Sequence, residues 1–276
     1  MFTRLMRRPP FSWATKATLW CLHCIEKFLL FRLWGTIVVQ WCIYHAGKRF
    51  FAHARIEVYG ASYLKNFGDT AIFAVNHASE LDIPIICLAL YHAGVLRDRM
   101  PLIWLVRGKK FYDDMGRIRA WLYGGFLFKL VGGYPVTPKE ARPVEDPEGR
   151  NRLDAHIALL KAGYSVVIFP EGATTRDGAL LPAKAGVAIL SEQSQCPVIP
   201  MAIEGTFGLS LDDFRTGKKL VRVFFGAPLP LYKIHQRASG GACADNDFAH
   251  KRRIMRRARF VMRRIKALLE KHETKE

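Results

Sequence analysis

Short apolar runs alternate with helical stretches from about residue 54 to the C-terminus. Several of these runs are continuously apolar, which is typical of strands that are covered on both faces. Alternation of strands and helices is typical of α/β domains. We therefore expect an α/β fold with a mixed, largely parallel sheet flanked by helices. The expected strands span residues 54–59, 71–76, 102–106, 133–136, 165–169, 198–203 and 221–225, and the expected helices lie around residues 82–93, 117–130, 148–162 and 183–194.

The N-terminal stretch 11–47 is the most hydrophobic part of the chain and holds four of its six tryptophans. Glu26, Lys27 and Arg32 interrupt it, which leaves less uncharged length than the roughly 20 residues of a spanning helix. This pattern favours an apolar helical membrane segment that lies in, or dips into, one leaflet, and a single spanning signal anchor is the alternative. Basic residues near the N-terminus predict that the protein lies at the cytoplasmic face of a membrane, which in a bacterium is the inner membrane.

The C-terminal residues 247–271 predict a long amphipathic helix, because apolar residues recur on one helical face and arginines fill much of the rest. One interpretation is a helix that packs on the domain and leaves a solvated basic face. The other, which the apolar N-terminal segment favours, is a helix held at an anionic membrane surface. The expected organisation is a membrane-associating helical segment over residues 1–50, a central domain over residues 51–235 and a basic amphipathic helix over residues 236–276.

The net charge of +18, from 42 basic and 24 acidic residues, indicates an anionic partner. Residues 1–50 carry +7 and residues 251–276 carry +8, so the central region is nearly balanced. Nucleic-acid-binding domains more often concentrate positive charge on the module that reads the nucleic acid, so this distribution disfavours a nucleic-acid partner. Six scattered cysteines form no disulfide framework, and Cys21 and Cys24 have no second pair at zinc spacing, so no metal site is expected.

The segment Asn76–Asp82, with the sequence N-H-A-S-E-L-D, follows an expected strand and precedes an expected helix. On a helix His77 and Asp82 would point about 140° apart, so they can meet only if the residues between them form a loop. An aspartate bonded to one imidazole nitrogen fixes the tautomer and makes the other nitrogen a better base. The segment predicts a base that removes a proton from a substrate hydroxyl. A loop histidine beside a helix-capping aspartate is the alternative.

The segment Phe169–Gly178, with the sequence F-P-E-G-A-T-T-R-D-G, follows another expected strand. Ligands in α/β folds often bind at this end of the strands. Backbone amides and the guanidinium of Arg176 suit a phosphate or a developing oxyanion. Taken alone, the segment is equally consistent with an ordinary surface turn.

Together the two segments resemble motifs of the glycerolipid acyltransferase family, which includes 1-acylglycerol-3-phosphate acyltransferases. The resemblance extends over roughly residues 55–230, most of the chain. The matching residues are Asn76, His77 and Asp82 of N-H-x4-D, Phe169, Pro170, Glu171 and Gly172 of F-P-E-G, the downstream Arg176, Asp177, Gly178, Lys184 and Gly186, and the apolar strand with a central proline at Val198–Ile203.

The resemblance implies an O-acyltransferase domain that moves a fatty acyl group from acyl-CoA or acyl carrier protein to the hydroxyl of a lysophospholipid, with 1-acylglycerol-3-phosphate as the first expectation. His77 is then the general base and Asp82 its support. Neither a metal nor a redox cofactor is implied, and the thioester is a co-substrate. The residues expected to contact substrate are Asn76, Glu171, Gly172, Thr174, Arg176 and Lys184.

The chain departs from the family pattern at two places. Ala173-Thr174 stands where Thr-Arg is usual, so we expect Arg176 to take over the missing arginine's role. The second family motif usually ends in an arginine, but Gly132–Pro138 has none, and the nearest is Arg142. In the family these basic residues are associated with the acceptor's phosphate. Another lyso-lipid acceptor, such as a lyso-aminolipid, or glycerol-3-phosphate therefore stays open.

Two rival functions come from other classes. A serine hydrolase is disfavoured because the chain has no G-x-S-x-G nucleophile motif. A non-enzymatic membrane-binding protein would use the basic ends alone, and it leaves the two central motifs without a role.

Overall fold

A seven-stranded sheet forms the centre of the computed structural model, which describes residues 34–65, 67, 70–106, 131–136, 153–233 and 247–273. The strand order is β1-β7-β6-β2-β5-β3-β4. Neighbouring strands run parallel except for β6 and β7, which are antiparallel. The strands are β1 (Arg55–Tyr59), β2 (Ile72–Val75), β3 (Ile103–Val106), β4 (Gly133–Pro135), β5 (Val166–Ile168), β6 (Val198–Glu204) and β7 (Leu220–Phe225).

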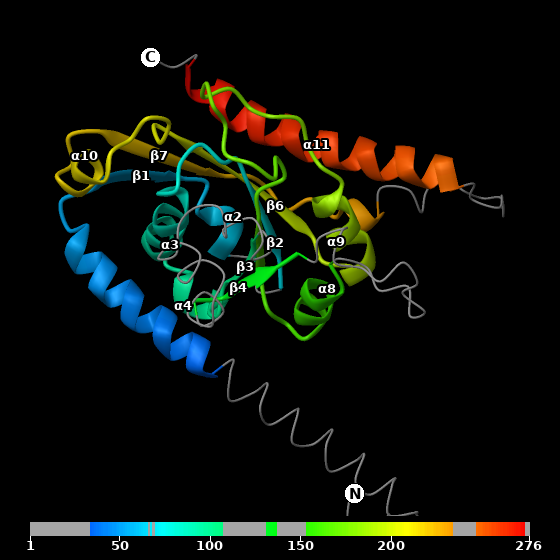
Figure 1. The fold of residues 1–276 in the computed structure, drawn as a ribbon, viewed down its shortest axis with the longest axis horizontal. Coiled ribbons are helices and arrows are strands. Elements are labelled where there is room, and N and C mark those ends of the chain that lie inside the picture. Colours follow the sequence, from blue (N-terminus) through cyan, green and yellow to red (C-terminus); the bar gives the residue numbers. More distant parts are fainter. Residues whose placement is uncertain are drawn as a thin grey trace, which may run out of the picture.

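Helices cover both faces of the sheet (Figure 1). The helix over residues 34–50 precedes β1, and one long helix ends the described chain. The others are α2 (Ser62–Lys65), α3 (Asp82–His92), α4 (Leu96–Arg99), α8 (Asp154–Lys161), α9 (Gly186–Ser194), α10 (Leu211–Arg215), the short 3-10 helix η3 (Leu231–Lys233) and α11 (Asp247–Glu273).

Two apolar cores lie on opposite faces of the sheet because successive strand side chains point to opposite sides. On β2, Ile72 and Ala74 face one core, which also holds buried residues of α8, α9 and α11. Phe73 and Val75 face the other, which holds buried residues of α2, α3 and α4. Strands β2, β5 and β6 are buried almost throughout, as their continuous apolar sequences predict.

All seven expected strands are present, each within one residue of its predicted ends. The helices expected around residues 82–93, 148–162, 183–194 and 247–271 are confirmed as α3, α8, α9 and α11. The helix expected at 117–130 lies outside the described residues. Three helices of four or five residues, α2, α4 and α10, are too short to show a periodic pattern and were not predicted.

The helix over residues 34–50 is attached to the domain by a glutamine in its apolar sequence. Gln40 Nε2 donates to the backbone oxygens of Leu102 and Val131, at 2.7 and 2.9 Å, and Gln40 Oε1 accepts from the Leu102 amide at 2.9 Å. Tyr44 packs against the core of the α3 face. Large apolar side chains on the rest of this helix, Trp34 and Trp41 among them, are more than half exposed.

The predicted N-terminal membrane segment is described only from residue 34 onward. In the part of the chain that the structure describes, no helix combines the length and apolarity needed to cross a bilayer.

The apolar side of α11 is buried against the domain. Ile254, Val261 and Ile265 are 4% exposed or less and pack in the core shared with α8 and α9. The guanidinium of Arg257, also buried, donates to the Glu192 carboxylate of α9 at 2.9 Å. The structure therefore agrees with the first interpretation of the C-terminal sequence, a helix that packs on the domain and leaves a basic outer face.

Replacing Phe214 with alanine tests the core of the α3 face. Phe214 is fully buried, and its ring lies 4.9 Å from that of Phe51. The cavity left by Phe214→Ala should lower the free energy of unfolding by about 3 to 5 kcal/mol, measured by urea denaturation. Phe248 is 66% exposed, and Phe248→Ala should change the same quantity by less than about 0.5 kcal/mol. Equal losses in both variants would contradict the described core.

Candidate functional site

The two sequence motifs meet at one edge of the sheet. Strands β2 and β5 are parallel neighbours, so the loops that follow them leave the sheet at the same edge. The first loop carries the N-H-x4-D residues, and the second carries the F-P-E-G residues. Crevices at the carboxyl ends of parallel strands are where open α/β sheets bind ligands.

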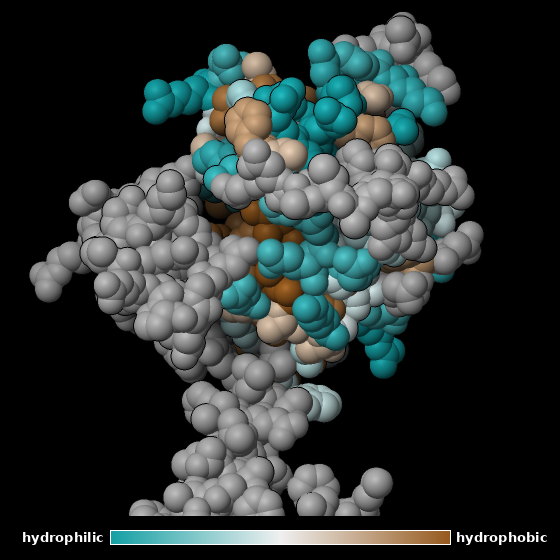
Figure 2. Space-filling view, turned by 90° about the vertical axis from the view of Figure 1, so that its right-hand side faces the viewer, coloured by the Kyte–Doolittle hydropathy of each residue, from teal (hydrophilic) through white to brown (hydrophobic). Residues whose placement is uncertain are grey.

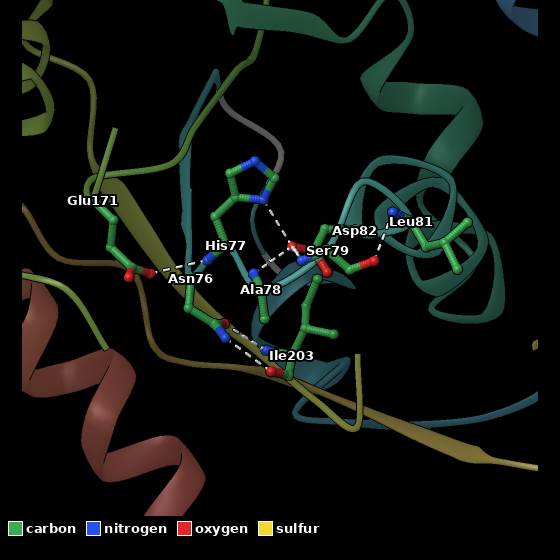
Figure 3. Close-up of polar contacts among 8 residues, drawn as sticks. All are labelled: Asn76, His77, Ala78, Ser79, Leu81, Asp82, Glu171 and Ile203. Carbon is green, nitrogen blue, oxygen red and sulfur yellow. Dashed lines mark hydrogen bonds and ion pairs between the residues drawn. The ribbon is translucent and has the colours of Figure 1, made fainter. Parts of the chain in front are cut away.

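His77 and Asp82 lie in direct contact (Figure 3). Asp82 is the first residue of α3, and its Oδ2 lies 2.8 Å from His77 Nδ1. The same oxygen accepts from the backbone amides of Ala78 and Ser79, so the loop curls around the carboxylate. A carboxylate carries no proton to donate, so Nδ1 carries the hydrogen and Nε2 holds the free lone pair. Asp82 is fully buried and the His77 side chain is 19% exposed, which leaves the imidazole accessible.

The Phe169 ring also holds the His77 imidazole in place. The Phe169 ring stacks on that of His77, with 4.0 Å between centroids and 18° between planes. Stacking and the Asp82 bond together fix both the position and the rotation of the imidazole. Sequence reasoning assigned Phe169 no role of its own, although its place at the start of F-P-E-G was the available signal.

Asn76 extends the sheet with its side chain. Its Nδ2 donates to the Ile203 oxygen at 2.9 Å, and its Oδ1 accepts from the Ile203 amide at 2.8 Å. The side-chain amide thereby replaces a backbone partner for β6, directly before His77. These contacts make Asn76 a positioning residue, and its expected contact with substrate stays a prediction.

Glu171 joins the two loops from inside the protein. It is 2% exposed, and its Oε1 accepts from the His77 amide while Oε2 accepts from the Leu181 amide, at 2.9 and 2.7 Å. Burial raises the pKa of Glu171, although the two amide donors act in the opposite direction. Both carboxylate oxygens are thus used by the backbone, and Glu171 shapes the site without presenting its charge to solvent.

Gly172 and Lys184 lie against each other next to Glu171. Gly172 has a φ of +66°, a conformation that L side chains rarely adopt. A Cβ at this position would lie 2.8 Å from both Cδ and Nζ of Lys184. Because position 172 has no side chain, the Lys184 side chain can lie next to it. Lys184 is exposed to solvent.

Thr174 and Arg176 flank the point at which their loop contacts His77. The amide of Thr175, between them, donates to the His77 oxygen at 3.0 Å. Both Thr174 and Arg176 are exposed. The loop turns back at Asp177, whose pKa is lowered by bonds from the Ala179 amide and the Thr175 hydroxyl. Arg176 and Lys184, the two basic residues predicted to contact substrate, therefore lie at the same edge of the sheet as His77.

No three His, Cys, Asp or Glu side chains are grouped as metal ligands within the residues that the structure describes.

Comparison with known proteins assigns the chain to a family. Residues 55–204, more than half of the chain, match the sequence profile of the family Acyltransferase. The chain belongs to the acyltransferase family. Strands β1, β2, β3, β4, β5 and β6 and both motif loops fall within the matched residues.

Individual relatives support this assignment. A 1-acyl-sn-glycerol-3-phosphate acyltransferase of Limnanthes douglasii is 50% identical over 151 residues, which are 55% of this chain and 46% of that protein. A 1-acyl-sn-glycerol-3-phosphate acyltransferase of Bacillus subtilis (strain 168) is 32% identical over 155 residues, 55% of this chain and 63% of that protein. The matches to the first such relatives span less than half of their lengths.

The fold matches a solved structure of similar size. The crystal structure of the 1-acyl-sn-glycerophosphate acyltransferase PlsC from Thermotoga maritima superposes with a TM-score of 0.54 at 18% identity, over 90% of this chain and 88% of that one. At this identity the likeness establishes the fold alone.

Replacing Glu171 with glutamine tests the link between the loops of this acyltransferase-family domain. Glutamine offers one acceptor oxygen, and its NH2 group would face one of the two backbone donors. Glu171→Gln should lower the free energy of unfolding by roughly 1 to 3 kcal/mol. Hydrogen exchange at the His77 and Leu181 amides should become faster.

The matched control is Glu57→Gln on β1, which changes an exposed glutamate that contacts Arg222. This variant should leave both amides protected. Unchanged exchange at His77 and Leu181 in Glu171→Gln would show that the carboxylate does not hold the loops together.

Proposed function

We propose that the protein is a membrane-associated O-acyltransferase that moves an acyl group from a thioester donor to the hydroxyl of a lysophospholipid, most simply 1-acylglycerol-3-phosphate. The observation that carries the proposal is the His77–Asp82 pair, 2.8 Å apart, at the N-H-x4-D positions of a domain that belongs to the acyltransferase family. The names of the relatives support the acceptor class.

The proposed reaction begins with His77 as general base. Because Asp82 holds the hydrogen on Nδ1, Nε2 can take the proton from the acceptor hydroxyl. The hydroxyl oxygen then attacks the thioester carbonyl carbon and forms the new C–O bond. As the tetrahedral intermediate collapses, the C–S bond breaks, and the departing sulfur takes the proton from Nε2. The side chain returns to its neutral state with no covalent enzyme intermediate and no bound cofactor.

The acceptor's phosphate is proposed to contact Lys184 and Arg176. Thr174 occupies the position that usually holds the family's arginine. Lys184 lies over Gly172, and Arg176 flanks the loop's contact with His77. Cations at these two places suit an anionic headgroup. Because the arginine is missing, a lyso-aminolipid or glycerol-3-phosphate is the second candidate acceptor, and a panel of lyso-lipids with one acyl donor distinguishes them by product mass.

Membrane association is proposed to occur through the helix over residues 34–50, at the cytoplasmic face. Trp34 and Trp41 are 66% and 53% exposed. Tryptophan favours the headgroup level of a bilayer, and an amphipathic helix can lie there. The Gln40 contacts with the domain would hold the sheet at a fixed position relative to the lipid surface.

Replacing His77 with alanine tests the base. His77→Ala should lower the rate of acyl transfer by about a thousandfold or more, because it removes the group that accepts the proton. Product formation from acyl-CoA and lysophosphatidate is followed by mass spectrometry. His92→Ala, which removes an exposed histidine of α3, should retain activity. Near-normal turnover in folded His77→Ala protein would rule out the mechanism.

Replacing Lys184 with methionine tests the headgroup site. Methionine keeps an unbranched side chain over Gly172 and removes the charge. The loss of a charged contact should raise KM for lysophosphatidate about tenfold or more. KM for a lyso-lipid without a phosphate monoester should change much less. Lys161→Met, on the exposed side of α8, is the matched control. Equal effects of Lys184→Met on both acceptors would contradict a phosphate contact.

A further inference from the structure

We propose that the basic outer face of α11 is a docking surface for an acidic acyl carrier protein, which delivers the thioester donor. This rests on the acyl transfer proposed above and deepens it by naming the donor's surface. The α11 face is defined by exposed basic side chains between Phe248 and Lys271, namely Lys251, Arg252, Arg256, Arg259, Arg263, Arg264, Lys266 and Lys271.

The α11 face is almost purely positive. Its eight basic side chains are accompanied by a single exposed acid, Glu270, which lies 3.3 Å from Lys266. At the top of Figure 2, the level at which α11 lies in Figure 1, hydrophilic side chains lie beside some apolar ones. A concentration of one charge sign on a rigid helix attracts an oppositely charged macromolecule and speeds its association.

The apolar residues of α11 are already used within the protein. Val261 and Ile265 are fully buried in the core. Phe248 is the one large apolar side chain on the described part of α11 that is strongly exposed, and the Arg252 guanidinium lies 5.6 Å from its ring centre. Helices that bind membranes insert an apolar face beneath the headgroups. The α11 face offers charge without such a surface, which fits a charged protein partner better than a bilayer.

The α11 face also points away from the side proposed to meet the lipid. Tyr44 of the helix over residues 34–50 packs with the core on the α3 face of the sheet. Helix α11 packs with the core on the opposite face. Figure 1 shows the two helices on opposite sides of the sheet. With the aromatic helix at a bilayer, the α11 face remains open to a soluble partner.

Helix α11 is linked to His77 through two neighbouring strands. Its apolar side packs on β6, and β6 is hydrogen-bonded to β2, the strand that leads into His77. A carrier protein holds its thioester on a long flexible arm. Helix α11 and helix α3, which begins at Asp82, lie on opposite faces of the sheet. The arm of a carrier docked on α11 would therefore pass the edge of the sheet to reach His77, and the lyso-lipid could enter from the membrane side.

Charge reversal on the α11 face tests the proposal. The variant Arg256→Glu/Arg259→Glu/Arg263→Glu alters three side chains that share one side of the helix and are exposed. The full-length protein in lipid nanodiscs is assayed with the same acyl chain on acyl carrier protein or on CoA. We expect KM for the acyl carrier protein thioester to rise about tenfold or more, with KM for acyl-CoA nearly unchanged. Binding of fluorescently labelled carrier protein, measured by anisotropy, should weaken by a similar factor.

The matched control makes the same charge change elsewhere, as Arg97→Glu/Lys161→Glu/Lys219→Glu, at three exposed positions outside α11. It should leave both donors and carrier binding unaffected. If the α11 variant instead loses binding to anionic vesicles, with equal effects on the two donors, the face is a membrane contact and the proposal is wrong. If carrier protein does not bind the unaltered enzyme, the proposal fails even where acyl-CoA supports transfer. Absence of transfer from either donor would count against the proposed function, while the anisotropy measurement would still test the surface.

Discussion

The buried carboxylate of Glu171 joins two loops that are separated by 94 residues in the chain. One oxygen accepts the amide of His77, and the other accepts the amide of Leu181. Without such an acceptor, both backbone groups would be left unsatisfied near the protein interior, which costs more than a typical hydrogen bond gains. The rest of the site follows from this link, because it holds the imidazole loop against the loop that carries Phe169, Lys184 and Arg176. A residue that is only 2% exposed thus helps to determine where the reactive groups lie.

Much of the fold is predictable from the sequence because its strands are buried on both faces. A continuous apolar run as short as that of β6 fits a buried strand better than a helix, whereas the short helices α2 and α10 leave no periodic signal. The sequence also predicts that His77 and Asp82 meet across a loop, since helical spacing forbids their contact. It does not predict the Phe169 stack or the Asn76 pairing with Ile203. Both contacts depend on which strands become neighbours, and no local sequence pattern indicates the order of the strands.

The same limit applies to the contacts of Glu171, which the sequence does not predict. The motif places a glutamate after a strand and before a glycine, which indicates a shaped turn. The two oxygens of Glu171 accept backbone amides inside the protein. These contacts form only because the loops after β2 and β5 come close together. An acidic residue in a motif is easily taken for a group that acts on substrate. Glu171 is 2% exposed and each of its oxygens accepts one backbone amide, which gives it a positioning role, while its expected contact with substrate stays a prediction.

The described parts of the two chain ends lie on opposite faces of the sheet, which the sequence could not show. Along the chain the two basic ends look equivalent, and both were expected to face one anionic surface. In space their helices pack against opposite faces, one with exposed aromatic side chains and the other with exposed arginines. The apolar residues of α11 are buried in the core of the domain, so a partner could contact mainly its basic side chains. The helix over residues 34–50 has exposed tryptophans, which can enter lipid. In the proposed reaction the lipid acceptor and the carried donor would then be bound on separate sides, and His77 lies at the edge of the sheet between these sides.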